Sequence, residues 1–411
     1  MTTAEQAQAA EQAQAAEQAQ TGQVARAEMV REIYLAGIAG KKPKLSTDLT
    51  TLEDAARAVM EPHAHAYVAG DAGTGTTGSA NREAFEQWRL LPRMWKGVSE
   101  RDLSVSLLGQ HLDVPVLLAP VAAQTVAHPE GELASVRGAA EVGVPFVLSS
   151  FSSHSMEDVA KEAGSQPRWY QLYWPNDPEV AESLVRRVSV AGYTAIVVTV
   201  DNPTFGYRPS DLDAAYIPFV HGQGIANFTS DPAFQAGLPA DGGAMAAVGH
   251  WAKISSNPTL TWDDLPRLRQ WTDLPILIKG VQHPDDARRA LAAGADGVVV
   301  SNHGGRQLDG GVAALDALPA VRAAVGPGVP VLMDSGVRTG TDVVKALALG
   351  ADAVLYGRPY VYGLALDGQA GVEHVLRCLL ADLDLAMTLT GCPSIADITR
   401  ELLAPRGPLT I

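Results

Sequence analysis

Cysteine is scarce in this chain, which has only Cys378 and Cys392 among its 411 residues. Two thiols cannot build a disulfide framework, and no Cys/His spacing typical of a metal site is present, so we expect no bound metal. Long apolar runs are absent as well. None reaches the roughly 18 residues of a membrane-spanning helix, which predicts a protein without a membrane partner. The N-terminus lacks the basic, apolar and small-residue order of a secretory signal, so we predict a cytoplasmic protein.

Basic residues are in deficit. The chain has 31 Lys and Arg against 46 Asp and Glu, which gives a net charge of -15. This acidic balance argues against a nucleic-acid or anionic-membrane partner. Hydrophobic residues make up 46% of the chain and charged residues 19%, which is typical of a globular protein with a large core.

The pattern divides the chain into a head and one folded domain. Residues 1–25 are an imperfect AEQAQA repeat without an apolar stripe, and we expect a frayed helix or a disordered head there. A coiled-coil stub is the alternative, although sustained apolar positions at heptad spacing are missing. Residues 26–411 form the predicted domain, with an N-terminal extension of helices and turns over 26–112. Residues 113–411 hold a barrel and C-terminal helices.

Eight short apolar runs follow residue 112, each bounded by turn residues and separated from the next by helix-like sequence. They begin at Pro115, Pro145, Arg168, Ala195, Pro275, Gly297, Val329 and Ala353. Because these runs are continuous rather than alternating, they indicate strands buried on both faces. Eight such β/α units predict an α/β fold, a closed parallel (β/α)8 TIM barrel. A doubly wound open sheet is the competing interpretation, but no Gly-x-Gly-x-x-Gly follows the first strand.

The connection after the fourth strand is unusually long, from Asp201 to Pro275. It contains a stretch rich in Gly, Pro and Asn over residues 219–258. In a barrel this loop lies on the catalytic face, so we predict a mobile lid. The alternative is a decorative insertion that does not contact the substrate.

Polar residues stand at the C-terminal ends of nearly all the predicted strands, where barrels carry their active sites. His303 is a candidate general base, because an imidazole titrates near neutrality. A carboxylate such as Asp201 would orient the ring and stabilise its protonated form. Arg306 and Arg208 present planar donors suited to a substrate carboxylate.

Lys279 ends the otherwise apolar fifth strand and has two candidate roles, a Schiff-base nucleophile or electrostatic stabilisation of a reduced cofactor. The loops after the seventh and eighth strands are the common phosphate site of barrels. Here they supply Gly336, Arg338, Gly357 and Arg358. Glycine backbone beside arginine side chains predicts a phosphorylated substrate or cofactor.

Several separated motifs agree in order, among them VTVDNP, LIKGVQHPDDA, SNHGGRQLD, DSGVRTGTDVVKALALGA and GRP. With them, the chain from about Tyr34 to its C-terminus resembles the FMN-dependent L-2-hydroxy acid oxidase and dehydrogenase family. The segments PRMWKGVSERDLSVSLLG, FGYRPSDL and NFTSDPAFQ make it most similar to the lactate 2-monooxygenase and lactate oxidase members. The resemblance implies FMN as cofactor, a small L-2-hydroxy acid (L-lactate foremost) as substrate, O2 as acceptor, and a homotetramer or homo-octamer.

The resemblance also assigns residues. It makes His303 the base with Asp201 as its partner, gives the substrate carboxylate to Arg208 and Arg306, and lets Tyr67 and Tyr173 hydrogen-bond the substrate. Lys279 would lie by the flavin N1 and O2 edge and Asp334 by the ribityl chain, with Arg338, Gly357 and Arg358 at the phosphate. The full set implied to contact FMN is Ala122, Ser149, Gln171, Thr199, Lys279, Ser301, Asp334, Gly336, Arg338, Gly357 and Arg358.

Two positions depart from relatives within that family. Ala122 stands where lactate 2-monooxygenases carry glycine, as it does in the simple oxidases, and Phe151 stands where glycolate oxidases carry tryptophan. A released keto acid would give pyruvate and peroxide; a retained one would give acetate, carbon dioxide and water. Three alternatives stay open: a dehydrogenase with another acceptor, a Schiff-base barrel lyase that uses Lys279, and a non-catalytic barrel that binds a phosphate ligand.

Overall fold

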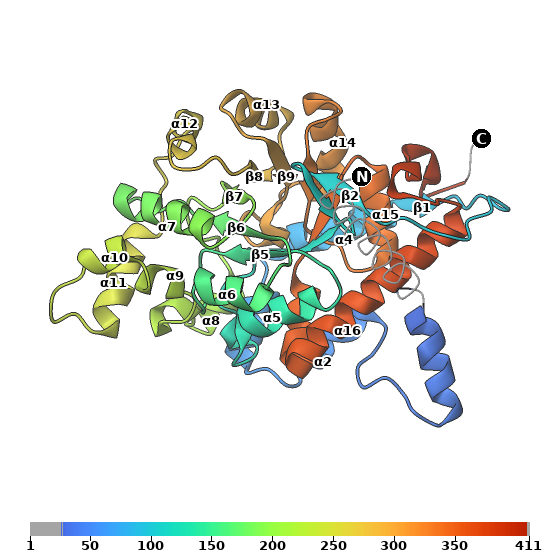
Figure 1. Ribbon diagram of the computed structural model, residues 1–411, viewed down its shortest axis with the longest axis horizontal. Coiled ribbons are helices and arrows are strands. Elements are labelled where there is room, and N and C mark those ends of the chain that lie inside the picture. Colours follow the sequence, from blue (N-terminus) through green and yellow to red (C-terminus); the bar gives the residue numbers. More distant parts are fainter. Residues whose placement is uncertain (1–25, 27, 409–411) are drawn as a thin grey trace, which may run out of the picture.

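A closed barrel of eight parallel strands forms the centre of the molecule (Figure 1). The computed structural model describes residue 26 and residues 28–408, so the head expected over residues 1–25 lies outside the described residues. Around the barrel the strands follow in the order β10-β11-β4-β5-β6-β7-β8-β9. Their bounds are β4 Val116–Leu118, β5 Phe146–Ser149, β6 Arg168–Leu172, β7 Ile196–Thr199, β8 Ile276–Val281, β9 Gly297–Val300, β10 Val331–Met333 and β11 Ala353–Tyr356. All eight predicted runs are strands, and the predicted (β/α)8 barrel is confirmed.

Alternate residues of each strand face opposite sides of the barrel wall. Leu117, Trp169 and Leu277 belong to an inner cluster that fills the barrel, while their neighbours pack outward against the helices. A hairpin of β2 (Val105–Leu107) and β3 (Gln110–Leu112) adds two leucines to the inner cluster. Its Gln110 bonds Thr194, just before β7, so the hairpin closes the N-terminal end of the barrel. The site must therefore lie at the other end.

Helices cover the outer face between the strands. They begin where the sequence provides caps: Ser155, Asp177 and Thr339 each accept a hydrogen bond from a first-turn backbone N–H. The helix-like sequence predicted between the strands does form helices. The main outer helices are α5 Gly131–Ala140, α6 Met156–Ala163, α7 Pro178–Val190, α13 Pro284–Ala292, α14 Ala314–Val325, α15 Gly340–Ala348 and α16 Arg358–Thr390.

We predicted an N-terminal extension of helices and turns; it contains them, and it contains short strands as well. Besides a helix over residues 28–38, which stands away from the barrel in Figure 1, it holds η1 Leu49–Thr51, α2 Leu52–Arg57, α3 Pro62–Ala69 and α4 Thr76–Glu86. It also contains the β2–β3 hairpin and β1 Trp88–Leu90, which pairs antiparallel with β12 Leu403–Pro405. Strands of three residues are too short for a periodic pattern to reveal.

The long connection after β7 is largely helical. It contains α8 Pro209–Asp213, η3 Pro218–His221, α9 Ala226–Thr229, α10 Pro232–Ala236, α11 Ala244–Ile254, η4 Trp262–Asp264 and α12 Leu265–Arg269. The buried Asn227 side chain accepts from the backbone of Met156 at 2.7 Å and donates to the carbonyl of Ser150 at 3.2 Å. Arg187 bonds Asp231 at 2.9 Å. These contacts anchor residues 226–236, so mobility of the lid stays a prediction for the rest of the insertion.

None of the helices within the described part of the chain combines the length and the apolar character that a membrane crossing requires.

Gly340 offers a test of the packing between α15 and α16. A Cβ at this position would overlap the backbone nitrogen of Leu383, whereas a Cβ on the exposed helical residue Gly249 would meet no atom within 4 Å. We expect Gly340→Ala to lower the free energy of unfolding by about 1–3 kcal/mol, because neither backbone can move aside easily. Gly249→Ala should leave it unchanged or raise it by up to about 1 kcal/mol. Urea unfolding followed by circular dichroism measures both, and equal effects would contradict the close approach.

Candidate functional site

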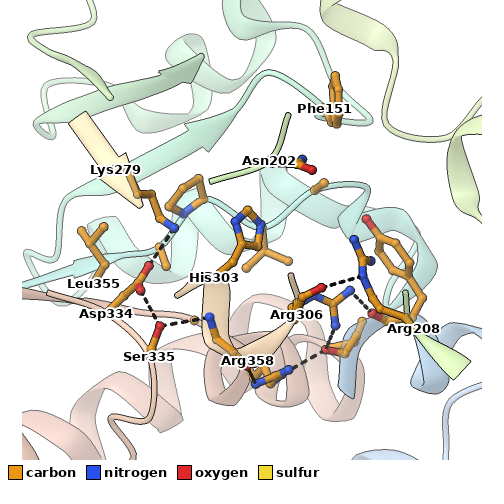
Figure 2. Close-up of a pocket in the computed structure, with 18 of the residues that line it drawn as sticks. Phe151, Asn202, Arg208, Lys279, His303, Arg306, Asp334, Ser335, Leu355 and Arg358 are labelled. Carbon is orange, nitrogen blue, oxygen red and sulfur yellow. Dashed lines mark hydrogen bonds and ion pairs between the residues drawn. The ribbon is translucent and has the colours of Figure 1, made fainter. Parts of the chain in front are cut away.

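A pocket opens at the C-terminal end of the barrel strands (Figure 2). Its walls come from the strand ends, the N-terminal extension and the insertion after β7, which contributes Phe205, Arg208 and Phe219. The insertion therefore lines the site, and the decorative alternative is not supported. The sequence-predicted residues that line the pocket are Tyr67, Ala122, Tyr173, Arg208, Lys279, His303, Arg306, Asp334, Gly336, Arg338, Gly357 and Arg358.

His303 stands near the centre of this view, and its ring is hydrogen-bonded to Asp201. Nδ1 lies 2.8 Å from Oδ1 of Asp201, and Nε2 lies 3.2 Å from the hydroxyl of Tyr173. The backbone of His303 has a φ of 59°, in the left-handed region that costs a non-glycine residue energy. Hydroxyl oxygens of Ser301 and Ser335 accept from the backbone nitrogens of His303 and Gly304, both at 3.0 Å, and hold the turn.

Burial favours a neutral imidazole at His303. Burial lowers the pKa of His303, and this effect outweighs the nearby Asp201 carboxylate, which raises it. Burial would raise the pKa of Asp201, but the interaction with His303 brings it below its usual value. A charged Asp201 accepts from Nδ1–H, which leaves the lone pair on Nε2 facing the pocket. This is the tautomer that a general base requires.

Lys279 is buried beside two acceptors. Its Nζ lies 2.9 Å from Oδ2 of Asp334 and donates to the hydroxyl of Ser301 at 3.0 Å. Burial lowers the pKa of Lys279, but the Asp334 and Asp201 carboxylates outweigh it and the net shift is upward. A Schiff-base lysine needs a free amine at neutral pH. The geometry instead gives the pocket a fixed positive charge.

Three guanidinium groups gather on the opposite side of His303 from Lys279, as Figure 2 shows. Arg208 pairs with Asp211 at 3.1 Å and Arg358 with Asp71 at 2.7 Å. Within residues 28–408, Arg306 donates only to main-chain oxygens, at Tyr67, Val68 and Gly70. Burial, with Arg208 and Arg358 nearby, lowers the pKa of Arg306 to about 9. Such a concentration of positive charge favours an anionic ligand.

A second cationic region lies at Arg338. Its guanidinium donates to the carbonyl of Val337 at 3.0 Å, and burial followed by the charge of Arg358 lowers its pKa. The neighbouring Gly336 has a φ of 95° and lets the backbone pass close to Asn81. The residues predicted to bind a phosphate, which are Gly336, Arg338, Gly357 and Arg358, are thus brought together.

The remaining predicted residues stand at or just after strand ends. Ser149 donates to Oε1 of Gln171 at 3.0 Å, and Thr199 is in register with Lys279 on the neighbouring strand. Nε2 of Gln171 is buried and has no hydrogen-bond partner among the residues that the structure describes. An orphaned amide donor on β6, with the buried Lys279 cation on β8, fits a ring system rich in carbonyl and nitrogen acceptors, such as a flavin. The donor set therefore suits the cofactor that the sequence implied.

The sequence analysis placed Phe151, Tyr67 and Tyr173 at the site but missed Phe219, which joins them in an aromatic wall of the pocket. Phe151 packs on Tyr173 with ring centroids 4.6 Å apart and on Phe219 at 5.0 Å, and Phe219 meets the edge of Tyr67 at 6.1 Å. Phe219 lay in the predicted lid, but nothing in the local pattern indicated that it points inward. Asn81 of α4 was missed as well; it exchanges amide hydrogen bonds of 2.8 and 2.7 Å with Asn302, next to His303.

Together, the barrel and its pocket bring a histidine–carboxylate pair and several cationic groups to one end of the strands, an arrangement typical of an enzyme of the (β/α)8 class. Residues 56–405 match the model of a family described as FMN-dependent dehydrogenase, and the chain belongs to this family.

Relatives agree with this assignment. An L-lactate oxidase from Lysinibacillus sphaericus is 44% identical over 329 residues, which cover 80% of this chain and 85% of that protein. A 4-hydroxymandelate oxidase from Amycolatopsis orientalis is 41% identical over 355 residues, 86% of this chain and 96% of its own. The solved structure of a Pediococcus acidilactici lactate oxidase has a TM-score of 0.81 at 37% identity and covers 90% of this chain and 97% of that one.

FMN is therefore the cofactor, and the protein is an FMN-dependent 2-hydroxy acid oxidoreductase. The prediction of a Schiff-base lyase and that of a non-catalytic barrel are set aside, the first also on the charge state of Lys279.

Arg338 tests the phosphate end of the site. We expect Arg338→Ala to weaken FMN binding about 10- to 100-fold, because a buried charge-assisted hydrogen bond contributes roughly 1.5–3 kcal/mol. The dissociation constant follows from titration of FMN fluorescence with apoprotein. Arg288→Ala is the control, since Arg288 is exposed and pairs only with Asp285. An unchanged FMN affinity in Arg338→Ala would place the phosphate elsewhere.

Proposed function

We propose that this protein oxidises a small L-2-hydroxy acid, L-lactate foremost, and passes the electrons to O2. One observation carries the proposal: Nε2 of a neutral His303 faces the same pocket as the guanidinium groups of Arg208, which is buried, and Arg306, which is half-buried. In a 2-hydroxy acid, the carboxylate is bonded directly to the carbon that bears the hydroxyl group and is oxidised. An anion clamp beside a base matches that arrangement.

In the proposed reaction, the pocket residues bind the substrate and take up its proton. Arg208 and Arg306 bind the substrate carboxylate, and the hydroxyl groups of Tyr67 and Tyr173 hydrogen-bond the substrate. Nε2 of His303 takes up the proton that leaves during oxidation, and Asp201 stabilises the resulting imidazolium. FMN, when bound, supplies the two-electron acceptor.

Ten residues that line or border the pocket would hold the cofactor. Lys279 stays an ammonium and supplies positive charge to it, as the paired Asp334 and Ser301 require. The others are Ser149, Gln171, Thr199, Ser301, Asp334, Gly336, Arg338, Gly357 and Arg358, and Ala122 presents a methyl group to the same space.

The aromatic wall supports a small substrate side chain. Phe151 and Phe219 are both almost fully buried and pack on each other, and Phe151 also packs on Tyr173, so large apolar rings line the pocket beside the base. A methyl group fits such a wall. The same rings would also pack on an aryl group, which makes an aryl 2-hydroxy acid the second candidate. An aryl group needs more room, which the half-exposed Phe205 would give by turning away from the pocket. The ratio of kcat/KM for L-lactate and L-mandelate decides between the two.

Ala122 favours the simple oxidase outcome. In it, L-lactate and O2 give pyruvate and hydrogen peroxide; retention of pyruvate would instead let peroxide attack it and give acetate, carbon dioxide and water. Product analysis separates these outcomes. Transfer to an acceptor other than O2 is the remaining alternative, and oxygen uptake during turnover tests it. A homotetramer or homo-octamer and a cytoplasmic location stay predictions; light scattering on the purified protein checks the first.

His303→Gln tests the base. With the wild type, we expect anaerobic L-lactate to bleach the visible flavin spectrum. The variant should do so about 10²- to 10⁴-fold more slowly while FMN binding is retained, because glutamine fills similar space but takes up no proton. His283→Gln changes an exposed histidine and should match the wild type. A His303→Gln variant reduced at near the wild-type rate would refute the assignment.

The pH dependence follows from the lowered pKa of His303. The neutral imidazole is the active form, so activity is present above the folded-state pKa and is lost as the pH falls through it. We expect kcat/KM to decline on the acidic side with an apparent pKa below the ordinary histidine value of 6.5. Steady-state rates across the pH range measure this limb, and a limb centred above that value would contradict the neutral base.

A further inference from the structure

The motif that contains His303 and Arg306 ends at Asp309, a residue to which the proposed reaction gives no part. We propose that Asp309 is a positioning residue at the site of the substrate carboxylate. Asp309 holds Arg306 and Tyr67 in place through residues 70–77 of the N-terminal extension. The proposal rests on the proposed function, because it assigns a role at the same substrate site.

The carboxylate of Asp309 binds one turn of the extension. Oδ2 accepts from the backbone nitrogen of Thr74 at 2.7 Å and from its hydroxyl at 2.8 Å. Oδ1 accepts from the backbone nitrogen of Thr76 at 2.8 Å, from its hydroxyl at 2.5 Å, and from the nitrogen of Thr77 at 3.3 Å. The bonds from Thr76 and Thr74 lower the pKa of Asp309, so the side chain is charged at neutral pH.

The same turn is fixed on its other side. The backbone nitrogen of Ala72 donates to the carbonyl of Gly305 at 2.9 Å, and that of Gly73 donates to Tyr207 at 2.8 Å. Gly73 has a φ of 55° and lies so close to Asp309 that a Cβ there would overlap the carboxylate. The turn therefore lies against the segment that follows β9. Gly305 contacts the start of the turn at Ala72, and Asp309 contacts its end at residues 74–77.

Arg306 takes its direction from the residues that lead into this turn. Its guanidinium donates to the carbonyl of Tyr67 at 2.7 Å and to that of Gly70 at 2.5 Å, and its Cζ lies 5.6 Å from the centroid of the Tyr67 ring. Among the described residues, Arg306 forms no ion pair with a carboxylate. Since main-chain oxygens alone orient it, a shift of residues 67–70 would move the guanidinium and the tyrosine together.

Asp309 itself does not line the pocket. It can influence the substrate only through the turn, and a displacement of about 1 Å is enough to impair a binding geometry. We call the hydrogen bonds between Asp309 and residues 74–77 the latch. If the latch served stability alone, its loss would lower the free energy of unfolding and leave the ligand affinity of the folded protein unchanged.

The experiment compares FMN-loaded variants by calorimetric titration with pyruvate, which binds without being oxidised, and by reduction with L-lactate. Asp309→Asn keeps the size of the side chain but removes its charge and one acceptor. We expect about tenfold weaker pyruvate binding and a similar rise in KM, with kcat and FMN affinity within about threefold of the wild type. Thr76→Val removes one partner of the latch, should shift both constants in the same direction, and decides the question if Asp309→Asn does not fold. Asp316→Asn, an exposed aspartate of α14, is the matched control and should behave as the wild type.

A double-mutant cycle tests the route. In an Arg306→Lys background, Asp309→Asn should weaken pyruvate binding much less than it does alone, because the group through which it acts has been replaced. Unchanged pyruvate affinity in the folded latch variants, or full additivity with Arg306→Lys, would overturn the proposal. If the wild type binds pyruvate but L-lactate does not reduce it, the proposed function fails while the pyruvate titration still decides the role of Asp309. The same titration with phenylglyoxylate covers the aryl alternative.

Discussion

Buried positive charge at the open end of the barrel is the constraint on which the site depends. Lys279 is buried, Arg306 and Arg338 are half-buried, and within the described part of the chain Lys279 alone of the three pairs with a carboxylate. Keeping a charge from water without a partner is expensive, so a ligand that carries negative charge offsets that penalty. In the proposed function a phosphate group at one end and a substrate carboxylate at the other would provide it. The chain thus stores much of its affinity for anions in the way it folds.

The barrel alone does not complete this arrangement. Its hydrophobic interior and the β2–β3 hairpin fix the strand ends, but the substrate side is closed by two segments that lie outside the eight β/α units. The extension supplies Tyr67 and the carbonyl groups that orient Arg306, and the insertion supplies Arg208 and Phe219. Part of the wall on the substrate side therefore comes from segments that can vary without disturbing the barrel, while Phe151 and Tyr173 come from the ends of barrel strands.

Much of this could be predicted from the sequence, for identifiable reasons. The eight strands were found because their apolar runs are continuous and separated by helical sequence, and His303 and Asp201 because each follows a strand whose end faces the same rim. The hairpin strands and the short helices after β7 could not be found, since three to five residues show no period. Phe219 and Asp309 act through partners far along the chain, and local patterns carry no information about such contacts.

The pairing of β1 with β12 affects how the protein folds during its synthesis on the ribosome. Trp88–Leu90 and Leu403–Pro405 stand at opposite ends of the folded region, so the ribosome must deliver almost the whole chain before this small sheet can form. The barrel faces the same delay, because its first strand, β4, pairs with its last, β11. Contacts of such high sequence separation slow folding and leave strand edges exposed during synthesis. We therefore expect the nascent chain to need protection from aggregation until its final residues emerge.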